Sequence, residues 1–158
     1  MNEWLTEELA EVQRKKADKQ AKQERADLIQ EQTKVLWNNL KPVLKDAVDQ
    51  MNAEGSEFRK MIGGLGLSDS DNIVTIRKIS KPPSVELQVS RNPNSVSWLY
   101  KVVERINATT TKERGHTTLQ VELDDDRRPY LQQGDTPVEL EDAVRQILRP
   151  FIHPELLE

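Results

Sequence analysis

Over the first third of the chain, apolar positions recur at the spacing of an α-helix. Strong helix formers dominate this part of the sequence, and Gly55 is its only glycine. The main stripe alternates steps of four and three residues and is widened by four neighbours: Ile29, Thr33, Leu36, Leu40, Val43 and Ala47, with Val35, Leu44, Val48 and Met51. The pattern predicts a long helical arm over residues 1–54 that packs one face along a partner surface.

Pro42 is the one residue between Glu3 and Asn52 that argues against a helix. A proline ring removes an amide donor and disfavours the helical conformation of the preceding residue. The apolar spacing nevertheless continues in phase across this position. We therefore expect a kink or a tight restart at Pro42.

The stripe fades toward the N-terminus. Residues 13–25 contain only Ala17 and Ala21 as apolar residues, and they carry six basic against two acidic side chains. A helix that is polar all round is not buried, so this segment projects into solvent or rests on a partner. Ahead of it lies a short apolar patch, which we expect to be exposed: Trp4, Leu5, Leu9 and Val12.

Glycines at positions 63, 64 and 66 end the helical region. They lack the Lys-Ser/Thr ending of a phosphate-binding loop, and no strand precedes them as a dinucleotide-binding motif requires. Residues 55–71 therefore read as a linker between the arm and a second unit.

From residue 72 onward, the apolar period changes from helical to two. Val85, Leu87 and Val89 alternate with polar residues, as do Leu119 and Val121, which is typical of strands with one buried face. Further strands are expected at 73–79 and 129–132, and short connections favour antiparallel neighbours. The sequence predicts an antiparallel meander of four to five strands over residues 72–132.

Residues 96–107 fit either a strand or a helix by periodicity. Val96, Trp98 and Tyr100 share one face of a strand, whereas Val96, Tyr100 and Val103 share one face of a helix. Enrichment in β-branched and aromatic residues favours the strand. Such a strand pairs with 117–124 across a loop at 112–115.

A C-terminal helix is predicted at residues 137–149. Thr136 and Glu139 form a capping-box pattern, Pro137 fits the first helical position, and Pro150 marks the end. One stripe has helical spacing: Leu140, Ala143, Val144, Ile147, Leu148 and Phe151. The fold class is therefore α+β, with a small domain at 72–158 whose C-terminal helix packs on one sheet face.

The sequence offers little catalytic chemistry. There is no cysteine, and His116 and His153 are too isolated to suggest an imidazole metal site. Residues 124–126 are three aspartates followed by two arginines, which is typical of a charged hairpin turn, although a carboxylate-based hydrolase remains the enzymatic alternative. We predict no enzyme activity, no cofactor, and no catalytic or metal-binding residues.

Composition narrows the cellular setting. Hydrophobic residues make up 35% of the chain and charged residues 32%, with a mean hydropathy of −0.73, so not every residue can belong to one compact core. No apolar run approaches the length of about 20 residues that a membrane-spanning helix needs. The N-terminus has no secretion-signal layout. A soluble, cytoplasmic protein without membrane contact is expected.

Two functions follow from these patterns. The first is a non-enzymatic interaction module (adaptor, scaffold or chaperone-like) that self-associates as a homodimer through its long helix, binds another protein, or does both. Its contact residues come from the stripe: Leu36, Leu40, Val43, Ala47 and Met51. Whether this stripe packs on the chain's own sheet or on a second copy is left open by the sequence.

The weaker alternative is nucleic-acid binding through the basic helix at 14–25 and basic strand faces at 77–105. Its candidate patch comprises Arg14, Lys15, Lys16, Arg77, Arg91 and Arg105. A net charge of −4 and an isoelectric point near 5.4 argue against it, because nucleic-acid modules are usually basic.

Overall fold

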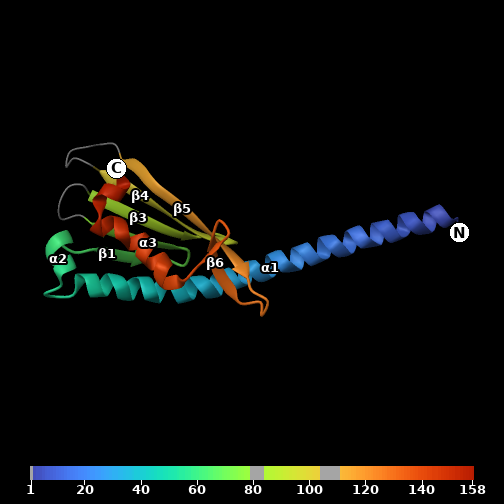
Figure 1. The fold of residues 1–158 in the computed structure, drawn as a ribbon, viewed down its shortest axis with the longest axis horizontal. Coiled ribbons are helices and arrows are strands. Elements are labelled where there is room, and N and C mark those ends of the chain that lie inside the picture. The colour runs from blue at the N-terminus through green and yellow to red at the C-terminus, as the bar shows by residue number, and fades with distance from the viewer. Residues whose placement is uncertain (1, 79–83, 104–110) are drawn as a thin grey trace.

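A computed structural model describes residues 2–78, 84–103 and 111–158. A long N-terminal helix leads into an antiparallel sheet, and a C-terminal helix packs against that sheet (Figure 1). The elements follow in this order: α1 (Glu3–Asn52), α2 (Glu57–Ile62), β1 (Gly66–Asp69), β2 (Ile73–Lys78), β3 (Ser84–Arg91), β4 (Ser95–Val103), β5 (Lys112–Leu123), β6 (Pro129–Gln133), β7 (Thr136–Val138), α3 (Leu140–Ile152) and the 3-10 helix η1 (Pro154–Leu157). The predicted α+β class is confirmed.

Within the described residues, the sheet has seven strands in the order β1 to β7, each antiparallel to its neighbours. The predicted meander is correct, but the predicted number of four to five strands is too low. The two additional strands are short: β1 lies in the expected linker, and β7 lies at the expected start of the C-terminal helix. Three or four residues are too few to display an alternating pattern, so pairing with a neighbour determines their structure.

The predicted linker at 55–71 is largely ordered structure. Ser56 caps α2, because its hydroxyl accepts hydrogen bonds from the amides of Phe58 and Arg59. Gly63 ends the helix with a φ of 92°. The Asn52 side chain then binds both the amide and the carbonyl of Leu65, each at 2.7 Å. The end of α1 is thus fixed to the start of the sheet.

The ambiguous segment is a strand over its described part, β4. The expectations for residues 104–107, including Arg105, lie outside the described residues. The predicted loop at 112–115 is wrong, because β5 begins at Lys112. Gly115 and His116 stand together opposite Leu99, which makes a bulge in β5. None of the first seven side chains of β5 is buried, so residues 112–118 show no apolar alternation. The sequence pattern therefore did not predict this part of the strand.

The C-terminal helix begins and ends three residues later than predicted. Thr136 and Pro137 pair with Gln133 and Gln132 in β7, so they do not cap or start α3. Pro150 lies inside the helix rather than at its end. Proline has no amide hydrogen, so the carbonyl of Gln146 lacks its helical donor.

The Tyr100 hydroxyl compensates for this gap. It donates a hydrogen bond to the Ile147 carbonyl and lies 3.4 Å from the Gln146 carbonyl. Burial raises the pKa of the Tyr100 hydroxyl, so it remains a donor throughout the physiological range. The ring also contacts Phe151 edge-on, with ring centres 6.2 Å apart. Tyr100 therefore fixes α3 to the middle of the sheet.

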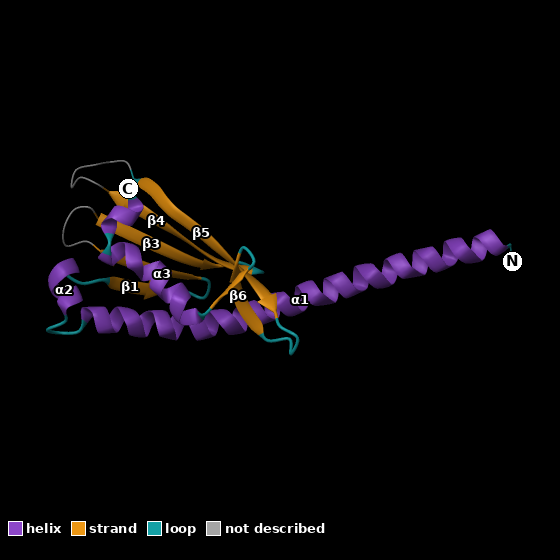
Figure 2. Ribbon diagram, viewed as in Figure 1, coloured by secondary structure: helices purple, strands orange, loops and turns teal. Residues whose placement is uncertain are grey.

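The C-terminal half of α1 belongs to the core. Figure 2 shows the strands as one layer, with α3 lying across it and α1 running along it. The Trp37 indole is 1% exposed and donates a hydrogen bond to the Asp71 carbonyl at 2.8 Å. The buried residues of this half form one face: Thr33, Leu36, Trp37, Leu40, Leu44, Val48 and Met51. The helix continues through exposed Pro42 as a single element.

Gly115→Ala is expected to lower the free energy of unfolding by about 2–4 kcal/mol, from backbone strain and overpacking together. Gly115 has a φ of 64°, and an added Cβ would lie 2.9 Å from the Tyr100 ring. Gly134→Ala is the matched control, because its φ is 59° but no atom lies within 4 Å of the added Cβ. Urea unfolding of both variants should give a clearly smaller loss for Gly134→Ala. Equal losses would contradict the importance of the Tyr100 contact.

Trp37→Phe is expected to cost about 1–3 kcal/mol, because the Asp71 carbonyl loses its buried donor. Trp4 is 60% exposed, so Trp4→Phe provides the control and should leave the unfolding midpoint unchanged at a concentration at which the chain is monomeric. Chemical denaturation followed by circular dichroism measures both variants. A Trp37→Phe midpoint equal to that of the parent protein would show that the hydrogen bond does not anchor α1.

Candidate functional site

The N-terminal half of α1 is a free helical arm. Every residue from 2 to 27 is exposed, and Figure 1 shows this part of α1 leaving the body of the molecule. At 1.5 Å per residue, the arm from Glu3 to Asp27 is about 38 Å long. One ion pair, Arg25 with Glu122 at 3.8 Å, joins its base to β5. The base of the arm is thus fixed to the sheet.

The end of the arm is amphipathic. Its apolar stripe has steps of four and three residues: Leu5 at 41%, Leu9 at 49% and Val12 at 46% exposure. One residue earlier in each turn, a second stripe contains Trp4, Glu8 and Glu11, and the Glu11 carboxylate is 3.3 Å from the Lys15 ammonium one turn further along. One residue later, the opposite flank contains Thr6, Ala10 and Gln13. The helix end therefore has an apolar face with an acidic and aromatic flank on one side and a neutral flank on the other.

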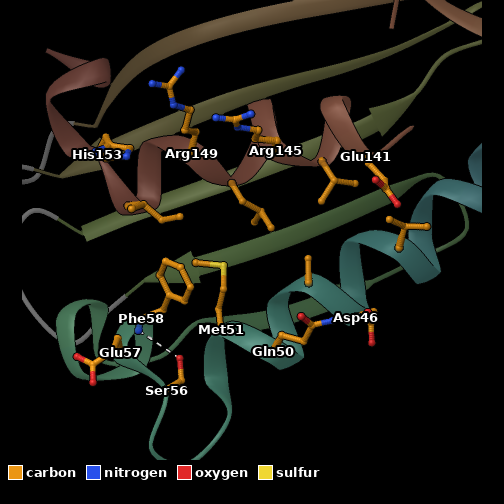
Figure 3. A pocket seen from close by; sticks show the side chains of 15 residues that line it. Asp46, Gln50, Met51, Ser56, Glu57, Phe58, Glu141, Arg145, Arg149 and His153 are labelled. Carbon is orange, nitrogen blue, oxygen red and sulfur yellow. Dashed lines mark hydrogen bonds between the residues drawn. The ribbon is translucent and has the colours of Figure 1, made fainter. Parts of the chain in front are cut away.

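A groove lies at the other end of the molecule, between the end of α1, helix α2 and helix α3 (Figure 3). Its volume is about 840 Å³. Apolar side chains from all three helices line it: Val43, Ala47, Met51, Phe58, Val144, Leu148 and Ile152. Phe58 is 41% exposed, so part of this apolar lining faces solvent.

The two rims of the groove differ in charge. On the α3 side, Glu141, Arg145, Arg149 and His153 recur every four residues and are exposed, so this rim has a carboxylate at the start of α3 and two guanidinium groups after it (Figure 3). On the α1 and α2 side, Asp46 and Glu57 line the opposite rim. His153 is 3.5 Å from Glu155, whose carboxylate lies beyond the groove lining. A ligand with an apolar face and an acidic flank matches this arrangement.

The structure uses the predicted self-association stripe inside the chain. Leu36, Leu40 and Met51 are buried in the core, and Val43 and Ala47 pack against it. These contacts answer the question left open by the sequence: the stripe covers the chain's own sheet. The helical arm at 1–54 thus consists of an exposed half and a core half.

The proposed basic patch is not gathered on one surface. Arg14, Lys15 and Lys16 lie on the arm, which leads away from the sheet (Figure 1). Arg77 is 3.5 Å from Glu86, and Arg91 donates a hydrogen bond to Asn72. The aromatic rings that could stack with bases, Trp98 and Tyr100, are buried in the core at 3% and 2% exposure.

The aspartate cluster forms a turn. The Asp124 carboxylate accepts hydrogen bonds from the amides of Asp126 and Arg128, at 2.9 and 2.8 Å. Asp124 and Asp125 also line a separate hollow of about 670 Å³ beside β6 and the start of α3. In the part of the chain that the structure describes, no three His, Asp or Glu side chains converge as a metal site.

Membrane insertion through a helix finds no support in the described ranges. None of their helices combines sufficient length with sufficient apolar character to cross a bilayer.

Comparison with known proteins gives no family for this chain. No family model matches it, and no curated protein or solved structure shows significant similarity to it. Function is therefore inferred from the residues and their geometry.

The sequence identified the arm but missed the groove. The exposed arm could be predicted because a helix of polar composition is not buried. The apolar patch at its end could be predicted because polar residues follow it along the chain. The groove joins residues 43–51, 56–58 and 141–153, which lie together only in the folded chain. The i, i+4 spacing of Arg145, Arg149 and His153 predicts a basic row on one side of the C-terminal helix. The sequence does not indicate which other residues this row faces.

Proposed function

We propose that the chain is a non-enzymatic protein-interaction module, of the adaptor, scaffold or chaperone-like kind, that forms a homodimer through its N-terminal helix in the cytoplasm. The observation that carries this proposal is the exposed apolar end of the arm. Four large apolar residues between positions 4 and 12 are each at least 41% exposed. Clustered apolar exposure of this kind is typical of an interaction surface.

The contact residues of this proposal differ from those expected from the sequence alone. Leu36 and Leu40 are buried against the sheet, so self-association involves the exposed residues Trp4, Leu5, Leu9 and Val12, while Val43, Ala47 and Met51 of the stripe line the groove. Burying a leucine side chain contributes about 1.5–3 kcal/mol, and tryptophan is enriched among residues that dominate interface energies. A few such side chains from each copy provide substantial affinity.

Nucleic-acid binding is the second candidate, supported by the six basic side chains on the exposed arm at 14–25. An isolated basic helix tracks phosphates without reading bases. Affinity for duplex DNA should then fall steeply with salt, which a titration between 50 and 200 mM salt measures. Binding that is tight and falls steeply in this range would favour this candidate over self-association.

Leu5→Glu/Leu9→Glu is expected to convert the dimer to a monomer. Two carboxylates on the apolar stripe would have to lose their hydration in an interface, so the dissociation constant should rise at least about 100-fold. Sedimentation equilibrium of the full chain measures the change in mass. The unfolding free energy of the monomer should remain unchanged, because both side chains are exposed.

Ala17→Glu/Ala21→Glu is the matched control, since it adds the same charge to the arm beyond its apolar end. This variant should sediment as the parent chain does. The proposed homodimer is wrong if the parent chain is monomeric at all accessible concentrations, or if Leu5→Glu/Leu9→Glu leaves the mass unchanged.

A further inference from the structure

We propose that the apolar end of the arm in one copy of the chain docks in the α1–α2–α3 groove of a second copy. This inference rests on the proposed function and specifies its contact surface. The arm end presents four exposed apolar side chains, and the groove has Phe58 exposed and Val43, Ala47 and Ile152 partly exposed. The arginines on the α3 rim of the groove are opposite in charge to Glu8 and Glu11 on the arm end.

The two surfaces cannot meet within one chain. Leu9 and Ala47 belong to the same continuous helix, α1, and are 38 residues apart. At 1.5 Å per residue, this separation is roughly 57 Å. Figure 1 shows the arm pointing away from the end of the molecule that carries α2. The arm that docks in a given groove therefore belongs to another copy of the chain.

The apolar faces correspond in kind. The stripe of Leu5, Leu9 and Val12 covers two turns of helix, and the groove is lined on both sides by Val43, Ala47, Leu148 and Ile152. An amphipathic helix that lays its apolar face into such a groove is a recurrent mode of recognition. The arm enters as a preformed helix, so docking orders no further backbone.

Charge selects one direction of docking. With the apolar stripe against the groove, Glu8 and Glu11 lie on one flank, and Thr6 and Gln13 lie on the other. The acidic flank matches Arg145 and Arg149 on the α3 rim, beyond the carboxylate of Glu141, and the neutral flank meets Asp46 and Glu57. Reversing the helix would place carboxylates against carboxylates, which is unfavourable.

Trp4 strengthens this match. It lies on the same flank as Glu8 and Glu11, one turn before Glu8, and is 60% exposed. Docking brings its indole beside the guanidinium groups on α3, and arginine above an indole face is a favourable cation–π pair. The emission of Trp4 should shift to shorter wavelength on association, because docking removes its ring from water.

Pairing between two arms is the competing geometry, and the sequence disfavours it. The steps of four and three that place Leu5, Leu9 and Val12 on one seam place Lys16 and Lys19 on the same seam. Only three seam positions are then apolar, whereas a coiled coil needs about three to four heptads of apolar seam. The groove accommodates a short apolar stripe without requiring it to continue.

A charge-exchange experiment on the full chain tests the docking. Arg145→Glu/Arg149→Glu reverses the rim, and Glu8→Lys/Glu11→Lys reverses the arm flank. Each double variant should weaken association by about tenfold or more, because like charges then face each other across the interface. The chain carrying all four substitutions should recover most of the lost affinity. Sedimentation equilibrium and the Trp4 emission shift on dilution are the two readouts.

Lys34→Glu/Lys45→Glu is the matched control, because it reverses two exposed positive charges on α1 outside the groove lining. It should associate as the parent chain does. If association depends on Leu5 and Leu9 but Arg145→Glu/Arg149→Glu has no effect, the arms bind each other and the groove docking is wrong, while the homodimer stands. No recovery in the chain with four substitutions also overturns the docking. If Leu5→Glu/Leu9→Glu has no effect, the homodimer itself is wrong.

Discussion

The apolar face of the sheet must be covered, and the rest of the structure depends on how this is done. The buried hydrophobic side chains of β2 to β6 in the described residues belong to one cluster with those of α1 and α3. Two directional contacts fix these helices on the sheet: Trp37 binds the Asp71 carbonyl, and Tyr100 binds the Ile147 carbonyl. Because α1 is held over residues 33–51, its N-terminal half leaves the sheet in a fixed direction, and the groove forms where its C-terminal end meets α3.

Sequence periodicity predicted the elements that bury a full face and missed those that do not. The stripe of α1, the alternation in β3 and the apolar face of α3 each extend over enough residues to display their period. β1 and β7 are too short for this, and the first part of β5 is exposed, so its pattern carries no apolar signal. The capping pattern at Thr136 and Glu139 was misleading, because Thr136 pairs with Gln133 in β6 and Glu139 is itself the residue that precedes α3.

The candidate site divides in the same way. Composition alone showed that residues 13–25 are solvated and that Trp4, Leu5 and Leu9 form an apolar end. The role of the stripe from Leu36 to Met51 needed the fold, because a helical face has the same pattern whether it covers its own sheet or another copy. The groove needed the fold still more, since its apolar lining and its two rims come from three helices.

The continuity of α1 has a consequence for the energetics of recognition. A polar segment such as residues 13–25 forms little helix by itself, because nucleating a helix is unfavourable. Here the buried half of α1 supplies the nucleus, so each residue of the arm needs only to propagate a helix that already exists. Packing of the buried half of α1 in the core thereby keeps the apolar end of the arm helical, although the arm between them is about 38 Å long. A substitution that loosens Trp37 would then weaken the proposed docking of the arm end without touching any residue of the proposed interface.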